Sequence, residues 1–152
     1  MPPPSIPDDI VKLEREDLPL LAALLRANHL PDDDCAEQAQ HFCALYRDGE
    51  LVAAGGLEPA GDYALLRSIV VQAPHRGQGL ARRITEHLLQ RAGQGGVRAV
   101  YLLTESAADY FTGLGFRPVA RADVPPDIVR TRQFSALCPD SASCLFLPLP
   151  RA

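Results

Sequence analysis

The stretch His75-Arg76-Gly77-Gln78-Gly79 places two glycines between an apolar segment and a segment with helical spacing. The first amide N–H groups of a helix have no partner within the helix, and the helix dipole adds partial positive charge there. Glycine lets the backbone take a positive φ and approach an oxygen closely. This order of residues therefore suits an anion held by backbone amides, and a plain tight turn is the alternative.

The spacing around this turn excludes two common phosphate-binding motifs. A P-loop needs Lys and then Ser or Thr after its last glycine, whereas Leu80 and Ala81 follow here. A dinucleotide-binding fingerprint needs a third small residue at the position of Arg82. The pattern that remains is Arg-x-x-Gly-x-Ala, formed by Arg76, Gly79 and Ala81.

Two acidic residues are candidates for general-base chemistry. Glu58 lies at the predicted end of the strand that precedes the apolar strand 63–72, and a carboxylate there could take a proton from a reacting group. A solvated turn residue is the alternative. Glu105, at the end of the predicted strand 97–103, is a second candidate, and it is equally explained as a first-turn residue favoured by a helix dipole.

Arg67 is a charged residue inside the otherwise apolar strand 63–72, so we expect it to be paired or to lie at a cleft. By alternation it shares a face with three apolar residues, Leu65, Ile69 and Val71. The planar donors of its guanidinium suit a carboxylate or phosphonate-like group. In one hypothesis, Arg67 therefore binds the acid group of an amino-acid substrate. The other is a structural ion pair with Glu58 or Asp62.

The elements that must position these residues read as one mixed sheet with helices on both faces. Strands are expected at 9–14, 42–46, 51–57, 63–72, 97–103, 116–119 and 144–149, and helices at 17–28, 79–92, 106–114 and over most of 125–137. Asp48-Gly49 predicts a hairpin turn, and 56–62 a second turn. Asp17 is expected to cap the first helix, and Asp34 with Glu37 has capping-box spacing.

Length and composition limit the number of domains and the classes of partner that this chain can have. The 152 residues suit one domain, expected at 9–150 after a flexible leader, 1–8. The net charge of −4 argues against a nucleic-acid partner, and no apolar run is long enough for a membrane span, so a cytoplasmic location is expected. The four cysteines show no Cys-x-x-Cys spacing, which predicts no metal site. Cys138 and Cys144 read as two unlinked thiols rather than a pair that binds trivalent arsenic. The sheet edges make a homodimer a reasonable expectation.

Two segments carry a resemblance to a known family. SIVVQAPHRGQGLARRITEHLL, residues 68–89, resembles the pyrophosphate loop of the GNAT acyltransferases, which bind acetyl-CoA. AADYFTGLGFRPVA, residues 107–120, is similar to the helix and strand that close the CoA side in this family. With the order of the elements, the resemblance covers nearly the whole chain. It implies an α/β (α+β) GNAT fold with a splayed central pair of parallel strands, and acetyl-CoA as acetyl donor with no metal.

The resemblance also assigns residues to the reaction. It places pantetheine between strands 63–72 and 97–103, against the backbone of Ile69, Val70 and Val71. The N–H near Val71 would polarise the thioester carbonyl while a primary amine attacks it. The pyrophosphate would lie on the amides of six consecutive residues, Arg76, Gly77, Gln78, Gly79, Leu80 and Ala81. The family often has a tyrosine as general acid where this chain has Phe111, so Tyr110, one residue earlier, is the candidate.

The acceptor is indicated by the tail, residues 116–147, FRPVARADVPPDIVRTRQFSALCPDSASCLFL. It resembles small amino-acid N-acetyltransferases of the N-acetylglutamate synthase type, and the GNAT proteins of arsenic-resistance operons. That implies the α-amine of an amino acid, or of an arsenic- or phosphorus-containing mimic, as acceptor. Arg130 and Arg132 are either carboxylate contacts or part of a solvated helix face. The run 32–34, three aspartates, would instead favour a cationic acceptor such as a polyamine, an aminoglycoside or a protein N-terminus. The non-enzymatic alternative is a regulatory module that binds CoA but does not catalyse a reaction.

Overall fold

The structure, a computed structural model, describes residues 9–137 and 141–150, so the predicted leader and Cys138 lie outside the part described. The described chain forms one seven-stranded sheet in the order β1-β2-β3-β4-β5-β7-β6. Only β4 and β5 are parallel, and the other neighbouring strands are antiparallel, as expected for a mixed sheet. The strands are β1 Ile10–Lys12, β2 Phe42–Arg47, β3 Glu50–Ala60, β4 Tyr63–Val71, β5 Ala99–Thr104, β6 Arg117–Pro118 and β7 Ser143–Pro148.

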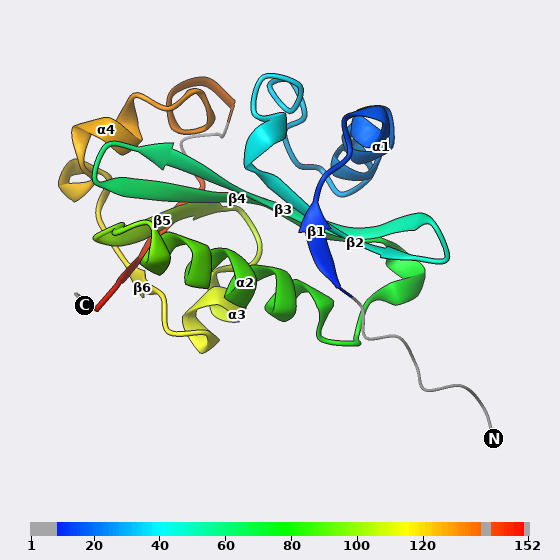
Figure 1. Ribbon diagram of the computed structural model, residues 1–152. Helices are drawn as coiled ribbons and strands as arrows, with labels where there is room; N and C mark the ends of the chain where they lie inside the picture. The colour runs from blue at the N-terminus through cyan, green and yellow to red at the C-terminus, as the bar shows by residue number, and fades with distance from the viewer. Residues whose placement is uncertain (1–8, 138–140, 151–152) are drawn as a thin grey trace.

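Helices cover both faces of this sheet (Figure 1). They are α1 Leu18–Ala27, α2 Leu80–Gln94, α3 Ala108–Gly113 and α4 Pro126–Val129, followed by a π-helical turn at Gln133–Leu137. The apolar cores separate accordingly: α2 and α3 pack on one face, and α1 and α4 form two smaller clusters on the other. No helix in the described ranges is long and apolar enough to cross a membrane.

The long helix α2 follows directly from its sequence. Four apolar residues at intervals of four, Leu80, Ile84, Leu88 and Ala92, are all buried against the sheet. Arg82 and Arg83, on the opposite side, are exposed. The helix begins after Gly79 and ends before Gly95, so both ends lie at glycines as expected.

The first hairpin also follows the predicted pattern. Asp48 and Gly49 have φ values of 51° and 78°, the left-handed conformation that a two-residue turn of type I′ requires. Arg47 pairs with Glu50 on the two sides of this turn. The turn predicted at 56–62 is wrong, because β3 continues through Ala60 and only Gly61 and Asp62 reverse the chain.

Two capping predictions are also wrong. Asp17 occupies the position before α1, but its side chain makes no capping hydrogen bond. Asp34 and Glu37 form no capping box, because Asp34 is buried against Arg67, and only the 3₁₀ turn Ala39–His41 follows. Asp34 and Glu37 are instead paired with arginines far away in the chain, Arg67 and Arg132.

The central strands part halfway along their length. β4 and β5 pair only at three positions, Tyr63 with Ala99, Ala64 with Val100 and Leu65 with Tyr101. Beyond Leu65 the two strands diverge, and the edge of β4 that faces β5 is left open. This is the splayed parallel pair expected from the family resemblance.

A bulge in β4 lies where the strands part. Val70 pairs with Ala54 and Arg67 with Gly56, so Ser68 and Ile69 together oppose Gly55 on β3. Ser68 takes a left-handed conformation with φ of 58°. The extra residue reverses the alternation of side chains, so Ile69 and Val71 pack toward α2. The prediction that Arg67 shares a face with these two residues is therefore wrong.

Candidate functional site

A cleft of about 310 Å³ opens between the parted strands. Residues 66–71 of β4 and 102–104 of β5 line it on the two strands, and Phe111 of α3 also lines it. Arg76 and Ala81 extend the lining into the glycine turn, and Asn28 and Leu30 border it from the loop after α1. Its volume is in the range of pockets that hold small ligands. The predicted residues that line this cleft are Arg67, Ile69, Val70, Val71, Arg76 and Ala81.

The backbone of Val71 faces the cleft. The N–H of Gln72 donates to the Val52 carbonyl at 2.8 Å, so the polar groups of Gln72 point toward β3. Successive residues of an antiparallel strand alternate between its two edges, so the N–H and C=O of Val71 point the other way, toward the open edge. Arg76 agrees with this, since its Nε donates to the Val71 oxygen at 3.2 Å. By the same alternation Val70, which pairs with Ala54, directs its backbone to β3.

The glycine turn joins this edge to α2. Gly77 and Gly79 have φ values of 79° and 76°, and a Cβ at either position would meet no atom within 4 Å. Their backbone conformation, rather than lack of space, therefore requires glycine. Gly79 is the residue before α2, so the amides of Leu80 and Ala81 belong to the unpaired first turn of that helix.

Arg47 supports the turn from β2, which was not anticipated from the sequence. Its Nη1 donates to Gln78 Oε1 at 2.5 Å and contacts His75 Nδ1 at 3.2 Å. These residues are separated by 28 and 31 positions in the chain, so no local pattern indicates the contact.

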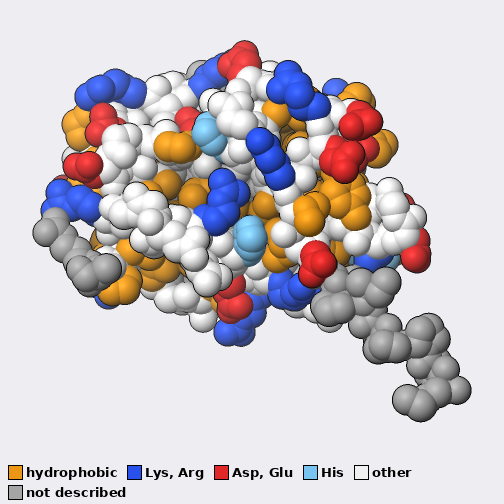
Figure 2. Space-filling view, in the orientation of Figure 1, with side chains coloured by type: hydrophobic (Ala, Val, Ile, Leu, Met, Phe, Trp, Pro, Cys, Tyr) orange, Lys and Arg blue, Asp and Glu red, His pale blue; other side chains and the backbone are white. Residues whose placement is uncertain are grey.

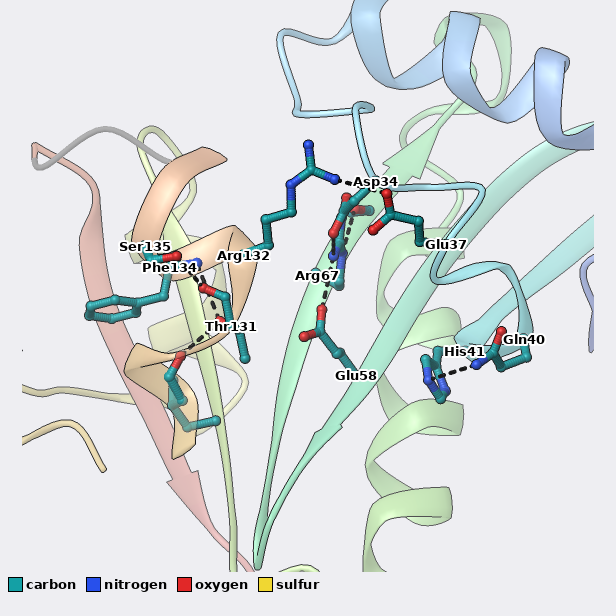
Figure 3. Close-up of polar contacts among 12 residues, drawn as sticks. Asp34, Glu37, Gln40, His41, Glu58, Arg67, Thr131, Arg132, Phe134 and Ser135 are labelled. Atoms are coloured by element: carbon teal, nitrogen blue, oxygen red, sulfur yellow. Dashed lines mark hydrogen bonds and ion pairs between the residues drawn. The ribbon is translucent and has the colours of Figure 1, made fainter. Parts of the chain in front are cut away.

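Arg67 lies at the centre of a buried ion cluster (Figure 3). Its guanidinium bonds both carboxylate oxygens of Asp34, through Nη1 at 2.6 Å and through Nη2, and Glu58 Oε1 at 2.9 Å. Nε also donates to Ser68 Oγ at 3.4 Å, so four of its five N–H groups are used. Burial alone would lower the pKa of Arg67, but the bonds to Asp34 and Glu58 raise it overall.

This cluster contains the Glu58 partner that the sequence suggested. Asp62 is not among the partners recorded for Arg67, and Asp34 was missed. The side chains of Arg67 and Asp34 are 1% exposed and that of Glu58 is 11% exposed, so Glu58 is the member nearest to solvent. Glu58 lies on β3 opposite Leu65, where β4 and β5 stop pairing.

The remaining predicted residues lie outside the cleft lining. Tyr110 is 43% exposed, and its ring meets the edge of Phe111 at 5.2 Å between centroids. Burial of part of the ring raises the pKa of Tyr110, and nearby Arg82 lowers it by less. Phe111 lines the cleft in its place. Glu105 is exposed in the bend after β5.

The acidic run is largely occupied by arginines of the same chain. Asp32 pairs with Arg26 at 3.3 Å, and Asp34 belongs to the buried cluster. Asp33 is exposed. Figure 2 shows acidic and basic side chains interspersed over the face in view, with no extended patch of one sign. No cluster of three or more His, Cys, Asp or Glu side chains suited to a metal ion occurs among the described residues.

One family profile matches most of the chain. The profile described as the acetyltransferase (GNAT) family aligns with residues 8–116, which include the cleft, the glycine turn and the buried cluster. The tail after residue 116, with α4 and β7, lies beyond this match.

Solved structures of low sequence identity share the fold. Rv2747 from Mycobacterium tuberculosis, in complex with CoA and NLQ, has a TM-score of 0.79 at 20% identity, covering 93% of this chain and 99% of that one. N-acetylglutamate synthase from Neisseria gonorrhoeae, complexed with coenzyme A and N-acetyl-glutamate, has a TM-score of 0.82 at 19% identity. The match covers 94% of this chain but 35% of that longer protein. The ribosomal-protein-S18-alanine N-acetyltransferase from Escherichia coli has a TM-score of 0.70 at 23% identity, covering 95% and 96%.

Proposed function

This chain belongs to the GNAT family of acetyltransferases, and we propose that it transfers the acetyl group of acetyl-CoA to the primary amine of a small molecule. One observation carries the proposal: the open edge of β4 lines the same cleft as Arg76 and Ala81, the residues on either side of the glycine turn before α2. The residues fit the donor, because an amide-rich turn and an exposed strand edge match a pyrophosphate followed by an amide-containing pantetheine chain.

The donor site uses backbone more than side chains. The amides from Gly77 to Ala81 receive the pyrophosphate, supported by the dipole of α2. The amide of Arg76, which was also expected to contribute, already donates to the Ala73 carbonyl at 3.2 Å. Pantetheine pairs along the edge of β4, where Ile69 and Val71 offer their backbone and Val70 packs into the core below. The Val71 N–H donates to the thioester oxygen, on which negative charge develops when the amine attacks.

Proton transfer is assigned to Glu58. The attacking nitrogen forms a bond to the acetyl carbon, the carbon–sulfur bond breaks, and CoA leaves as a thiolate. An α-amine has a pKa of about 8 and must lose a proton before or during attack. Glu58, directly or through a water, takes this proton at the point where the strands part. Tyr110 remains a candidate for returning a proton to sulfur, although a thiol of pKa about 8.5 leaves readily without one.

The acceptor class is the α-amine of a small amino acid, including arsenic- and phosphorus-containing amino acids. The tail sequence supports this class, and so does the fold likeness to an enzyme complexed with N-acetyl-glutamate. The case for a cationic acceptor is weaker than the run of three aspartates suggested. Two of them are already paired with Arg26 and Arg67, which leaves Asp33 as the exposed member.

A thiol-release assay tests this function. Purified protein is incubated with acetyl-CoA and a panel of amines that includes glutamate, phosphinothricin, spermidine and an alanine-terminated peptide, and products are identified by mass spectrometry. We expect free CoA and an N-acetylated amino acid in equal amounts. Turnover of spermidine or the peptide alone would favour the cationic alternative. Tight acetyl-CoA binding without thiol release for any amine would favour a regulatory module.

A further inference from the structure

The acceptor carboxylate needs a cation, and Arg67 is poorly suited to supply it. Its side chain is 1% exposed. The two terminal nitrogens of its guanidinium already donate to the two carboxylate oxygens of Asp34. A substrate carboxylate would have to displace a buried carboxylate, which leaves that buried charge without a partner and is strongly unfavourable. Another arginine near this end of the cleft is therefore required.

Arg132 extends from the tail to the loop that carries Asp34, outside the lining of the cleft itself. Its Nη1 lies 3.2 Å from Oε1 of Glu37, which is three residues after Asp34 in the loop that covers Arg67. Figure 3 shows Arg132 extending from the tail segment toward Glu37, which lies in the same loop as Asp34. The two partners are 95 residues apart in the chain, so the pair connects the loop after α1 to the tail.

The ion pair between Arg132 and Glu37 is exposed enough for another carboxylate to replace Glu37. The side chains of Arg132 and Glu37 are 45% and 66% exposed, and such surface ion pairs contribute little net stability. A substrate carboxylate can therefore replace Glu37 on this guanidinium at small cost, and a planar fork can hold it through two hydrogen bonds.

We propose that Arg132 binds the carboxylate of the acceptor amino acid, and that Glu37 occupies Arg132 until the acceptor replaces it. The inference rests on the proposed function. It assigns to Arg132 the preference for amines that carry a carboxylate over amines that do not. The other arginines recorded nearby are engaged differently. Arg76 bonds Asn28 and the Val71 carbonyl within the donor cleft, and Arg130 pairs with Asp127 on the exposed side of α4.

The two partners should respond in opposite directions when each is removed. Arg132→Gln should raise KM for glutamate about 10- to 100-fold, the range for a lost charge-assisted hydrogen bond. Glu37→Gln removes the competing carboxylate and should lower the same KM about two- to fivefold. A merely structural ion pair would make both substitutions act in the same direction. KM for acetyl-CoA should stay within about twofold of wild type in both variants.

Three controls test whether the change in KM reflects a specific contact with the substrate carboxylate or only the loss of a positive charge. Arg130→Gln removes an exposed arginine two residues away and should leave KM for glutamate unchanged. Arg132→Lys keeps the charge but loses the fork, so its KM should be intermediate. Glutamine and isoglutamine each lack one of the two carboxylates of glutamate. Arg132→Gln should abolish the preference of wild type for glutamate over one of these amides, which identifies the carboxylate that is bound.

Steady-state kinetics of thiol release, with thermal melting to confirm folding, decide the inference. An unchanged KM in Arg132→Gln, or a parallel rise in Glu37→Gln, would overturn it while wild-type turnover of glutamate still supports the proposed function. Wild-type protein that acetylates only amines without a carboxylate would overturn the inference and the amino-acid acceptor together.

Discussion

Arg67 connects three parts of the chain at the point where the central strands part. It lies on β4, Glu58 lies on β3, and Asp34 lies on the loop after α1. Removing one member of a buried ion cluster leaves a charge without its partner and typically costs about 3–5 kcal/mol. We therefore expect Arg67 to position Glu58 and the loop rather than to contact the acceptor itself.

Glu58 and Asp34 allow the catalytic and structural roles to be separated, because both bond Arg67. Glu58→Gln retains a group that can accept the bond from Arg67 but cannot take a proton. Its kcat should fall about 100-fold or more, the contribution expected of a general base. Asp34→Asn weakens the same cluster, and it should lower the free energy of unfolding while kcat stays within about tenfold of wild type.

Steady-state thiol release at saturating acetyl-CoA and acceptor measures kcat, and urea denaturation measures the free energy of unfolding. Equal losses of kcat in the two variants would show that Glu58 acts only by holding Arg67. In that case another group takes the proton, and Glu105 is the remaining carboxylate considered from the sequence.

At the scale of elements, the cleft depends on how β4 pairs with β3. The bulge at Ser68 turns Ile69 toward α2 and leaves the Val71 backbone at the open edge. Gly55 lies beneath this bulge. A Cβ at Gly55 would come within 2.5 Å of Ile69 Cδ1 and 2.6 Å of Ile84 Cγ2, so the absence of a side chain lets α2 and the bulged strand pack closely.

Gly55→Ala should therefore overpack the contact between α2 and β4. We expect the free energy of unfolding to fall by about 1–3 kcal/mol, and affinity for acetyl-CoA to fall because Ile69 lines the cleft. Gly93→Ala is the matched control, since Gly93 lies in α2 and a Cβ there meets no atom within 4 Å. It should leave the unfolding free energy unchanged or raise it by up to about 1 kcal/mol. Urea denaturation measures both, and equal stability of the two variants would contradict this packing.

Local signals in the sequence predicted the elements that depend on neighbouring residues. The hairpin at Asp48-Gly49 and the helix after Gly79 were expected from such signals and are present. The parting of the central strands is also present, but it was implied by the family resemblance rather than by a local signal. The turn predicted at 56–62 failed because Gly, Pro and Gly in that stretch read as turn residues. In the structure Gly56 lies under Phe42 and Arg67, so its lack of a side chain serves a close contact within β3.

The parts of the site that could not be predicted all depend on long-range contacts. The Asp34–Arg67 and Arg47–Gln78 contacts join residues 33 and 31 positions apart, and Arg132–Glu37 spans 95. The capping box assigned to Asp34 was a reasonable local reading that a buried partner on another strand overrode. The face of Arg67 was misassigned because a bulge depends on the register with β3, which alternation within one strand does not reveal.

In the whole molecule, segments far apart in the chain come together to form one proposed acetyl-CoA site. The cleft is lined by residues from Asn28 to Phe111, and α2 carries the glycine turn at its N-terminal end. Two glycines flank this helix with the same backbone conformation. Gly79 and Gly96 both have φ of 76°, and a Cβ at either position would meet no atom within 4 Å.

Calorimetric titration of acetyl-CoA into the Gly79→Ala and Gly96→Ala variants tests the central claim most directly. Each substitution places a side chain in the left-handed region and should cost a similar amount of stability, about 1–2 kcal/mol. Only Gly79→Ala disturbs the amides assigned to the pyrophosphate. We predict that its Kd for acetyl-CoA rises at least about tenfold, as expected when more than one charge-assisted hydrogen bond is weakened, and that Gly96→Ala binds as wild type does. Wild-type affinity in Gly79→Ala, or equal losses in both variants, would contradict the assignment of this turn as the acetyl-CoA site.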